Sequence, residues 1–133
     1  KINLKNILLK LKKNKKIKLL IVGISYKENS FSMVNSMFKE ILNDKRFNIT
    51  FFDSYFKKSN IKLNQVNKLT DSIDESDIVL FNYANNNDLK IIKKKFMKKY
   101  NKYLVNISTK QKLFLKSSKN IINFFSQQTL PIC

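Results

Sequence analysis

Glycine, histidine, arginine, cysteine and proline are almost missing from this chain. Its 133 residues include one glycine, one proline, one cysteine and no histidine, and Arg46 is the single arginine. Without histidine, neither a Cys/His zinc site nor a catalytic triad that contains histidine can be built. The single Cys133 excludes an intrachain disulfide, and its terminal position indicates a bystander thiol. We therefore expect no catalytic residue and no metal site in this chain.

The charge of the chain is strongly one-sided. Lysine supplies nearly all of the formal net charge of +18, and such a charge is typical of proteins that bind nucleic acid or an anionic surface. The chain is equally rich in Asn, Ile, Phe and Tyr, which share AT-rich codons with Lys. We interpret the lysines as a solvated surface produced by a biased genome, and a basic module that binds RNA or DNA is the alternative.

Size and hydrophobic content favour one folded domain. Hydrophobic residues make up 43% of the chain, which contains 11 Phe and 5 Tyr, and this composition argues against disorder. No apolar run reaches the roughly 18 to 20 residues that span a bilayer. Because the sequence begins with Lys and shows no signal peptide, we expect a part of a longer, cytoplasmic protein without a membrane partner.

Hydrophobic periodicity predicts alternating strands and helices. Helices are expected over residues 2–11, 31–42, 69–75 and 89–100, with a weak helical turn over 110–115, and a loop over 57–67. Strands are expected over residues 17–22, 48–52, 77–83, 103–107 and 121–125. This alternation predicts a three-layer, Rossmann-like α/β domain with a mostly parallel five-stranded sheet. We assign residues 1–16 to the end of a connecting helix and its linker, 17–126 to the domain, and 127–133 to a tail.

The only glycine, Gly23, directly follows the aliphatic run of the first strand. A strand that ends in a tight turn is where α/β proteins bind phosphate-bearing ligands. A dinucleotide fingerprint needs three glycines, however, and here Tyr26 follows instead, so NAD binding by this domain is not expected. Asp53, after the second strand, stands where such folds bind ribose, but without the fingerprint we interpret it as a turn or capping residue. Gly23 itself has the simpler alternative of a strand-ending turn.

Four segments together resemble the C-terminal domain of the UDP-glucose/GDP-mannose dehydrogenase family. The first is the strand followed by Gly23-Ile24-Ser25-Tyr26-Lys27, and the second is Phe52-Asp53-Ser54-Tyr55. The others are "ESDIVLFNYANNNDLK" and "KYLVNIS". The resemblance covers nearly the whole chain, from about residue 4 to 125.

The resemblance implies a function in substrate binding. In that family an N-terminal domain binds NAD, a central region supplies a catalytic cysteine, and the C-terminal domain binds the UDP-sugar or GDP-sugar. The implied partners are those two domains of an NAD-dependent oxidoreductase that works as a homodimer. Tyr26 and Lys27 would line the substrate cleft, where a lysine ammonium can face a diphosphate. A loop aromatic and a surface lysine are the simpler interpretations of this pair.

The chain also departs from the family pattern. Where the family has an acidic, arginine- and proline-containing segment, residues 31–37 keep only a serine in common. The arginine that usually follows the fourth strand is replaced by Asn106-Ile107-Ser108-Thr109, and Lys110 could supply only a point charge. A scaffold that has lost its ligand is therefore a third hypothesis, beside the nucleotide-sugar domain and the nucleic-acid module.

Overall fold

The molecule is built around one parallel sheet. The structure, a computed structural model, describes residues 4–12, 16–23, 39–53, 64–97, 100–108 and 119–124. In these residues the helices are α1 (Leu4–Leu11), α3 (Leu69–Glu75) and α4 (Asn86–Met97), and residues 39–42 are also helical. The strands are β1 (Ile17–Val22), β2 (Phe47–Phe52), β3 (Asn64–Gln65), β4 (Ile78–Phe81), β5 (Tyr103–Asn106) and β6 (Ile121–Asn123). The predicted Rossmann-like α/β class is confirmed.

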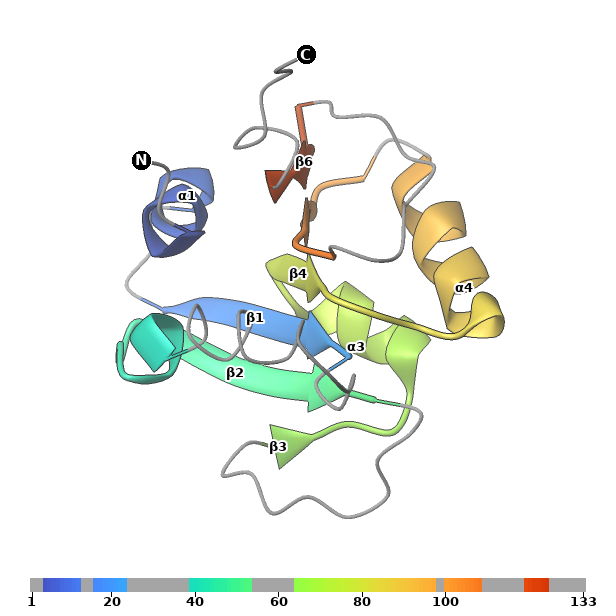
Figure 1. Ribbon diagram of the computed structural model, residues 1–133, viewed down its shortest axis with the longest axis horizontal. Helices are drawn as coiled ribbons and strands as arrows, with labels where there is room; N and C mark the ends of the chain where they lie inside the picture. The colour runs from blue at the N-terminus through green and yellow to red at the C-terminus, as the bar shows by residue number, and fades with distance from the viewer. Residues whose placement is uncertain are drawn as a thin grey trace.

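The strand order is β3-β2-β1-β4-β5-β6, and every neighbouring pair is parallel (Figure 1). This is the order of doubly wound folds that bind dinucleotides. From β1 the chain passes to β2 and β3 on one side, and then crosses to β4, β5 and β6 on the other. The direction of winding reverses between β1 and β4, so this pair marks the topological switch point.

β1 owes its central place to its nearly continuous apolar side chains. Every residue of β1 except Lys18 is buried, as expected for a strand covered on both faces. Its side chains alternate between two hydrophobic clusters. Leu19 and Ile21 pack in a cluster that contains Leu8 of α1, whereas Leu20 and Val22 pack in a cluster with α3 and α4. Helices thus cover both faces of the sheet, which confirms the three-layer prediction.

α1 belongs to the core. Leu8 is fully buried and Leu4 is 5% exposed, and both lie in the same cluster as residues of β1, β4 and β5. At the end of α1, the Lys12 ammonium lies 2.9 Å from the Asp77 carboxylate, just before β4. The segment that we assigned to the end of a connecting helix thus packs on this sheet, and its role as a connector between domains stays a prediction.

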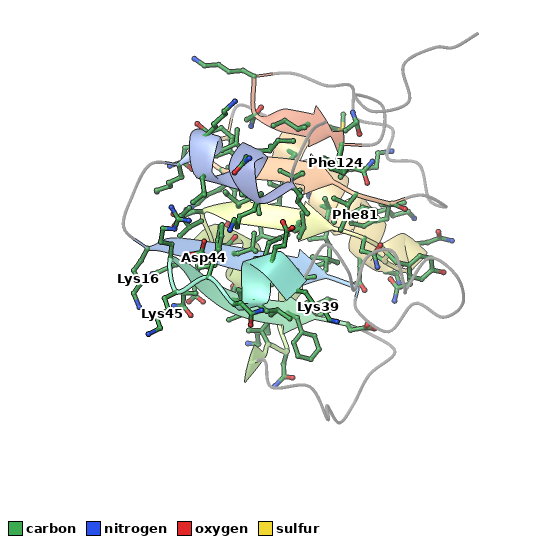
Figure 2. All side chains as sticks on the ribbon, turned by 60° about the vertical axis from the view of Figure 1, so that its left-hand side comes forward. Lys16, Lys39, Asp44, Lys45, Phe81 and Phe124 are labelled. Carbon is green, nitrogen blue, oxygen red and sulfur yellow. The ribbon has the colours of Figure 1, made fainter. Side chains whose placement is uncertain are left out.

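The loop before β2 is fixed by the only arginine. Arg46 donates hydrogen bonds to Asp44 from its backbone N, its Nε and its Nη2, the last at 2.6 Å. The Arg46 side chain holds the pKa of Asp44 well below its usual value. Figure 2 shows Asp44, with Lys16 and Lys45 near the amino ends of β1 and β2. This loop lies at the end of the sheet opposite to the candidate site described below.

Several predicted boundaries are wrong. β2 begins at residue 47 instead of 48, β4 spans residues 78–81 instead of 77–83, and β5 ends at residue 106 instead of 107. Two larger differences have a local cause. Residues 64–65, predicted as loop, form β3 by backbone pairing with Thr50 and Phe51 of β2; this short edge strand makes six strands where we predicted five. α4 begins three residues before the predicted start because Asn85 caps it, its Oδ1 accepting a hydrogen bond from the Asp88 N at 2.8 Å. Residue 100, the predicted end of that helix, is not helical.

None of the helices in the described ranges has the length and hydrophobicity of a membrane span.

Candidate functional site

The candidate site is the edge of the sheet at which the strands end. Gly23 follows β1, Asp53 follows β2, Asn82 follows β4 and Ile107 follows β5. Parallel strands bring these residues into one row, and α/β proteins bind ligands at this edge, beside the switch point. Here the switch point lies between Gly23 and Asn82.

At this edge, position 23 requires a glycine. Its φ is +89°, a backbone conformation that favours glycine. A Cβ built on Gly23 would lie 2.2 Å from the backbone O of Tyr83 and 2.7 Å from its N. The segments that follow β1 and β4 therefore approach each other closely. This close approach, and not the turn alone, requires a glycine at position 23.

Asn82 locks this close approach. Asn82 is buried, with 4% of its surface exposed, and its Nδ2 donates a 2.8 Å hydrogen bond to the Gly23 carbonyl. Its backbone N donates to the Val22 O at 2.9 Å and so continues the ladder between β4 and β1. Sequence analysis did not identify Asn82. The signal it offered was a polar residue directly after the apolar run of a buried strand.

Asp53 is also buried, with 6% of its surface exposed. The Gly23 N donates a 2.9 Å hydrogen bond to the O of Phe52, the residue before Asp53. The aspartate thus follows β2 directly beside the glycine turn, in the position where doubly wound folds place a carboxylate for a ribose. Its assignment as a turn or capping residue stays a prediction.

A second pair of amides joins β5 to β6. Asn106 Nδ2 donates to Asn123 Oδ1 at 3.0 Å, and the Ser108 N donates to Asn106 Oδ1 at 3.0 Å. This is where the resembled family carries an arginine. In the described residues the position holds an uncharged amide that ties two strands together.

The described part of this edge is poor in positive charge. The described residues that directly follow β1, β2, β4 and β5 are Gly23, Asp53, residues 82–85, Ile107 and Ser108. None of them is basic, although the chain as a whole carries +18. An anionic ligand at this edge would therefore need cations from other segments.

The predicted binding pair, Tyr26 and Lys27, lies outside the described residues, as do Lys110 and Cys133. The described part of this region ends at Gly23, three residues before Tyr26. Among the described residues, no group of three or more His, Cys, Asp or Glu side chains could hold a metal ion.

A groove of about 390 Å³ lies away from this edge, against α3. Its lining includes Lys18, Asn48 and Thr50 from the strands and Glu75 and Ser76 from the helix. Ser76 already donates its hydroxyl to the Ile73 O at 2.9 Å. The groove contains neither the switch point nor the glycine, so we place the candidate site at the carboxyl edge instead.

Comparison with known proteins agrees with the fold. No family model matches this chain, and no curated protein sequence matches it. Among solved structures, the pyrroline carboxylate reductase of Plasmodium falciparum, with NADP bound, matches with a TM-score of 0.52 and 20% identity over 71% of this chain. A protein from Thermus thermophilus matches with a TM-score of 0.50 and 13% identity, also over 71%.

These matches cover 34% and 28% of the two solved chains, so this chain spans about a third of their length. At such low identity they show the fold alone. The reductase is not a nucleotide-sugar dehydrogenase, so the narrower resemblance rests on the sequence motifs. The chain therefore has a Rossmann-like α/β fold, like that found in an NADP-bound reductase.

Proposed function

We propose that this chain is the nucleotide-sugar-binding domain of an NAD-dependent nucleotide-sugar 6-dehydrogenase. The ligand, a UDP-sugar or GDP-sugar, would bind at the carboxyl edge between β1 and β4. One observation carries the proposal. The only glycine of the chain stands at the switch point with a φ of +89° and no room for a side chain, and it opens the motif that ends in Tyr26-Lys27.

The described edge offers polar groups but no positive charge to a ligand. Backbone groups and amides such as Asn82 can orient hydroxyl groups, whereas the diphosphate needs a cation. Lys27 lies four residues after Gly23 in the sequence, and in this proposal it supplies that charge. Tyr26 would pack beside the ligand.

NAD would bind to another domain of the parent protein. The turn after β1 has a single glycine, so it lacks the fingerprint that lets a backbone cradle a pyrophosphate. In this proposal upstream regions bind the dinucleotide and supply the nucleophilic cysteine, and this domain binds and orients the substrate. Family resemblance further suggests that the whole protein forms a homodimer.

Calorimetric titration with UDP, UDP-glucose and GDP-mannose tests the proposal. We expect saturable binding with a Kd of about 1 mM or tighter, about −4 kcal/mol. Lys27→Ala should weaken it by tenfold or more, because it removes the positive charge of the motif. Lys94→Ala, an exposed lysine of α4, is the matched control and should bind as the unsubstituted chain does. No saturation by any of the three nucleotides would contradict the proposal.

Titration with single-stranded RNA and with UDP at two salt concentrations distinguishes the proposed function from the nucleic-acid hypothesis. The charge of +18 favours the latter. Binding through several phosphate contacts falls steeply as salt rises. Tight, salt-sensitive binding of single-stranded RNA together with indifference to UDP would favour the nucleic-acid module. A folded chain that binds neither ligand would leave the scaffold hypothesis.

A further inference from the structure

We propose that Asn82 is the positioning residue of this site. Its side-chain amide holds the carbonyl of Gly23 and thereby sets the direction in which the chain leaves β1. The effect of Asn82 on a ligand rests on the function proposed above, whereas its effect on the turn does not.

The hydrogen bonds of Gly23 show that the chain changes direction within this one residue. In an extended strand, the N–H and the C=O of one residue point toward the same neighbouring strand. The Gly23 N donates to the Phe52 O of β2 at 2.9 Å, yet its carbonyl accepts from Asn82, which follows β4, at 2.8 Å. The carbonyl has thus turned from the β2 side to the β4 side. The positive φ of Gly23 permits this rotation.

The side chain and the backbone of Asn82 have separable tasks. The backbone N bonds to the Val22 O at 2.9 Å, and the Tyr83 N also donates to Val22 O at 3.2 Å. These two bonds keep the register of β4 against β1 whatever side chain stands at position 82. Among the described residues the amide Nδ2 donates to the Gly23 carbonyl, so its removal should change the turn while the ladder stays.

Burial makes the amide bond matter. A buried carbonyl that has left its ladder needs another donor, and within the described part of the chain Asn82 Nδ2 supplies one to Gly23. Without it, the peptide after Gly23 is free to rotate toward water or toward β2. The direction in which the chain leaves β1 would then no longer be fixed at Gly23, and lost preorganisation lowers ligand affinity.

The single glycine provides a direct probe. Glycine labelled with ¹³C at its carbonyl gives one labelled residue in this chain, so the spectrum reports the hydrogen bonding and conformation of the Gly23 carbonyl alone. The signal is recorded for the unsubstituted chain, for Asn82→Ala and for Asn120→Ala, with and without UDP. Asn120 is the matched control, because its Nδ2 also donates to backbone carbonyls, those of Tyr100 and Lys102 at 3.2 and 3.1 Å, at the opposite end of the sheet. Circular dichroism checks folding, and Asn82→Asp, which keeps the volume but loses the donor, replaces Asn82→Ala if that variant does not fold.

We expect the Gly23 carbonyl signal to move in the Asn82 variant and to stay in Asn120→Ala. UDP affinity should fall about tenfold in the Asn82 variant, equivalent to about 1.4 kcal/mol, and stay unchanged in the control. An unmoved Gly23 signal would overturn the positioning role, whether or not UDP binds. A moved signal with unchanged UDP affinity would overturn the ligand role of Asn82 and leave the proposed function standing. A chain that binds no UDP even without substitution would overturn the proposed function and the ligand role together.

Discussion

Asp74 on α3 and Lys95 on α4 join the two helices that cover one face of the sheet. The Lys95 Nζ lies 2.7 Å from both carboxylate oxygens of Asp74. The Tyr100 hydroxyl donates to the same carboxylate, and its ring lies edge-on to Phe96 with centroids 5.1 Å apart. The hydrogen bonds from Lys95 and Tyr100 lower the pKa of Asp74. Burial and the bond to Asp74 raise the pKa of Tyr100.

Asp74→Asn should lower the free energy of unfolding by at most about 1 kcal/mol near neutral pH, since the pair is partly exposed. The pKa of Asp74 is lower in the folded chain than its ordinary 3.8, so its contribution is present above that value and is lost as the pH falls through the lowered pKa. Urea unfolding at about pH 7 and about pH 3 measures the difference. Asp71→Asn, on the exposed side of α3, is the control. An equal cost of Asp74→Asn at both pH values would show that the charge does not matter.

Gly23→Ala should destabilise the chain by more than the roughly 1 to 2 kcal/mol that a positive φ alone costs. The added Cβ would also meet the Tyr83 backbone at 2.2 Å, so β1 and β4 must separate. Denaturant unfolding measures the loss. Gly23→Asn separates the two causes, because asparagine tolerates a positive φ but carries the same Cβ. Recovery of stability in Gly23→Asn would mean that backbone strain, not the contact, sets the requirement.

Leu8→Ala should cost about 2 to 5 kcal/mol, as expected for a leucine removed from a packed core. Leu8 is fully buried among residues of the sheet. The neighbouring Lys10 is exposed, and Lys10→Ala should stay within about 0.5 kcal/mol of the original. This pair tests the predicted boundary at residue 16. A small effect of Leu8→Ala would show that α1 is dispensable for the fold of residues 17–126.

Lys12→Met should detach the end of α1 from the sheet at a cost of about 0.5 to 1 kcal/mol. The Asp77 carboxylate accepts hydrogen bonds from the Lys12 Nζ and from the Lys18 N, both at 2.9 Å. Burial by itself raises the pKa of Asp77. The two hydrogen bonds lower this pKa and contribute to a net downward shift. The loss should therefore be seen near neutral pH and fade in acid, as measured by thermal unfolding across pH. A loss of the same size at both ends of that range would exclude the ion pair as its cause.

Sequence alone predicted the elements whose signal is local. β1 has both predicted ends because a continuous apolar run stands between a charged segment and Gly23. α3 also has its predicted ends. β3 was missed because a two-residue edge strand is specified by the backbone of β2, which leaves no periodic pattern in its own residues.

The candidate site shows the same division. Gly23 could be predicted, since the rarity of glycine in the chain and its position after a strand are visible in the sequence. Asn82 could not, because its partner lies 59 residues away and only the sheet brings the two together. The one local signal, a polar residue directly after a buried strand, does not identify the partner of Asn82, and asparagine is common in this chain.

The central place of β1 has a consequence for synthesis. Leu19 pairs with Ile49 on one side and with Ile78 on the other, so a strand made early must wait for partners made much later. Until residue 81 has left the ribosome, one edge of this apolar strand has no native neighbour, and unpaired strand edges favour aggregation. Slow translation between β2 and β4 would lengthen that exposure, so the yield of folded chain should depend on translation speed and on chaperones that shield hydrophobic segments.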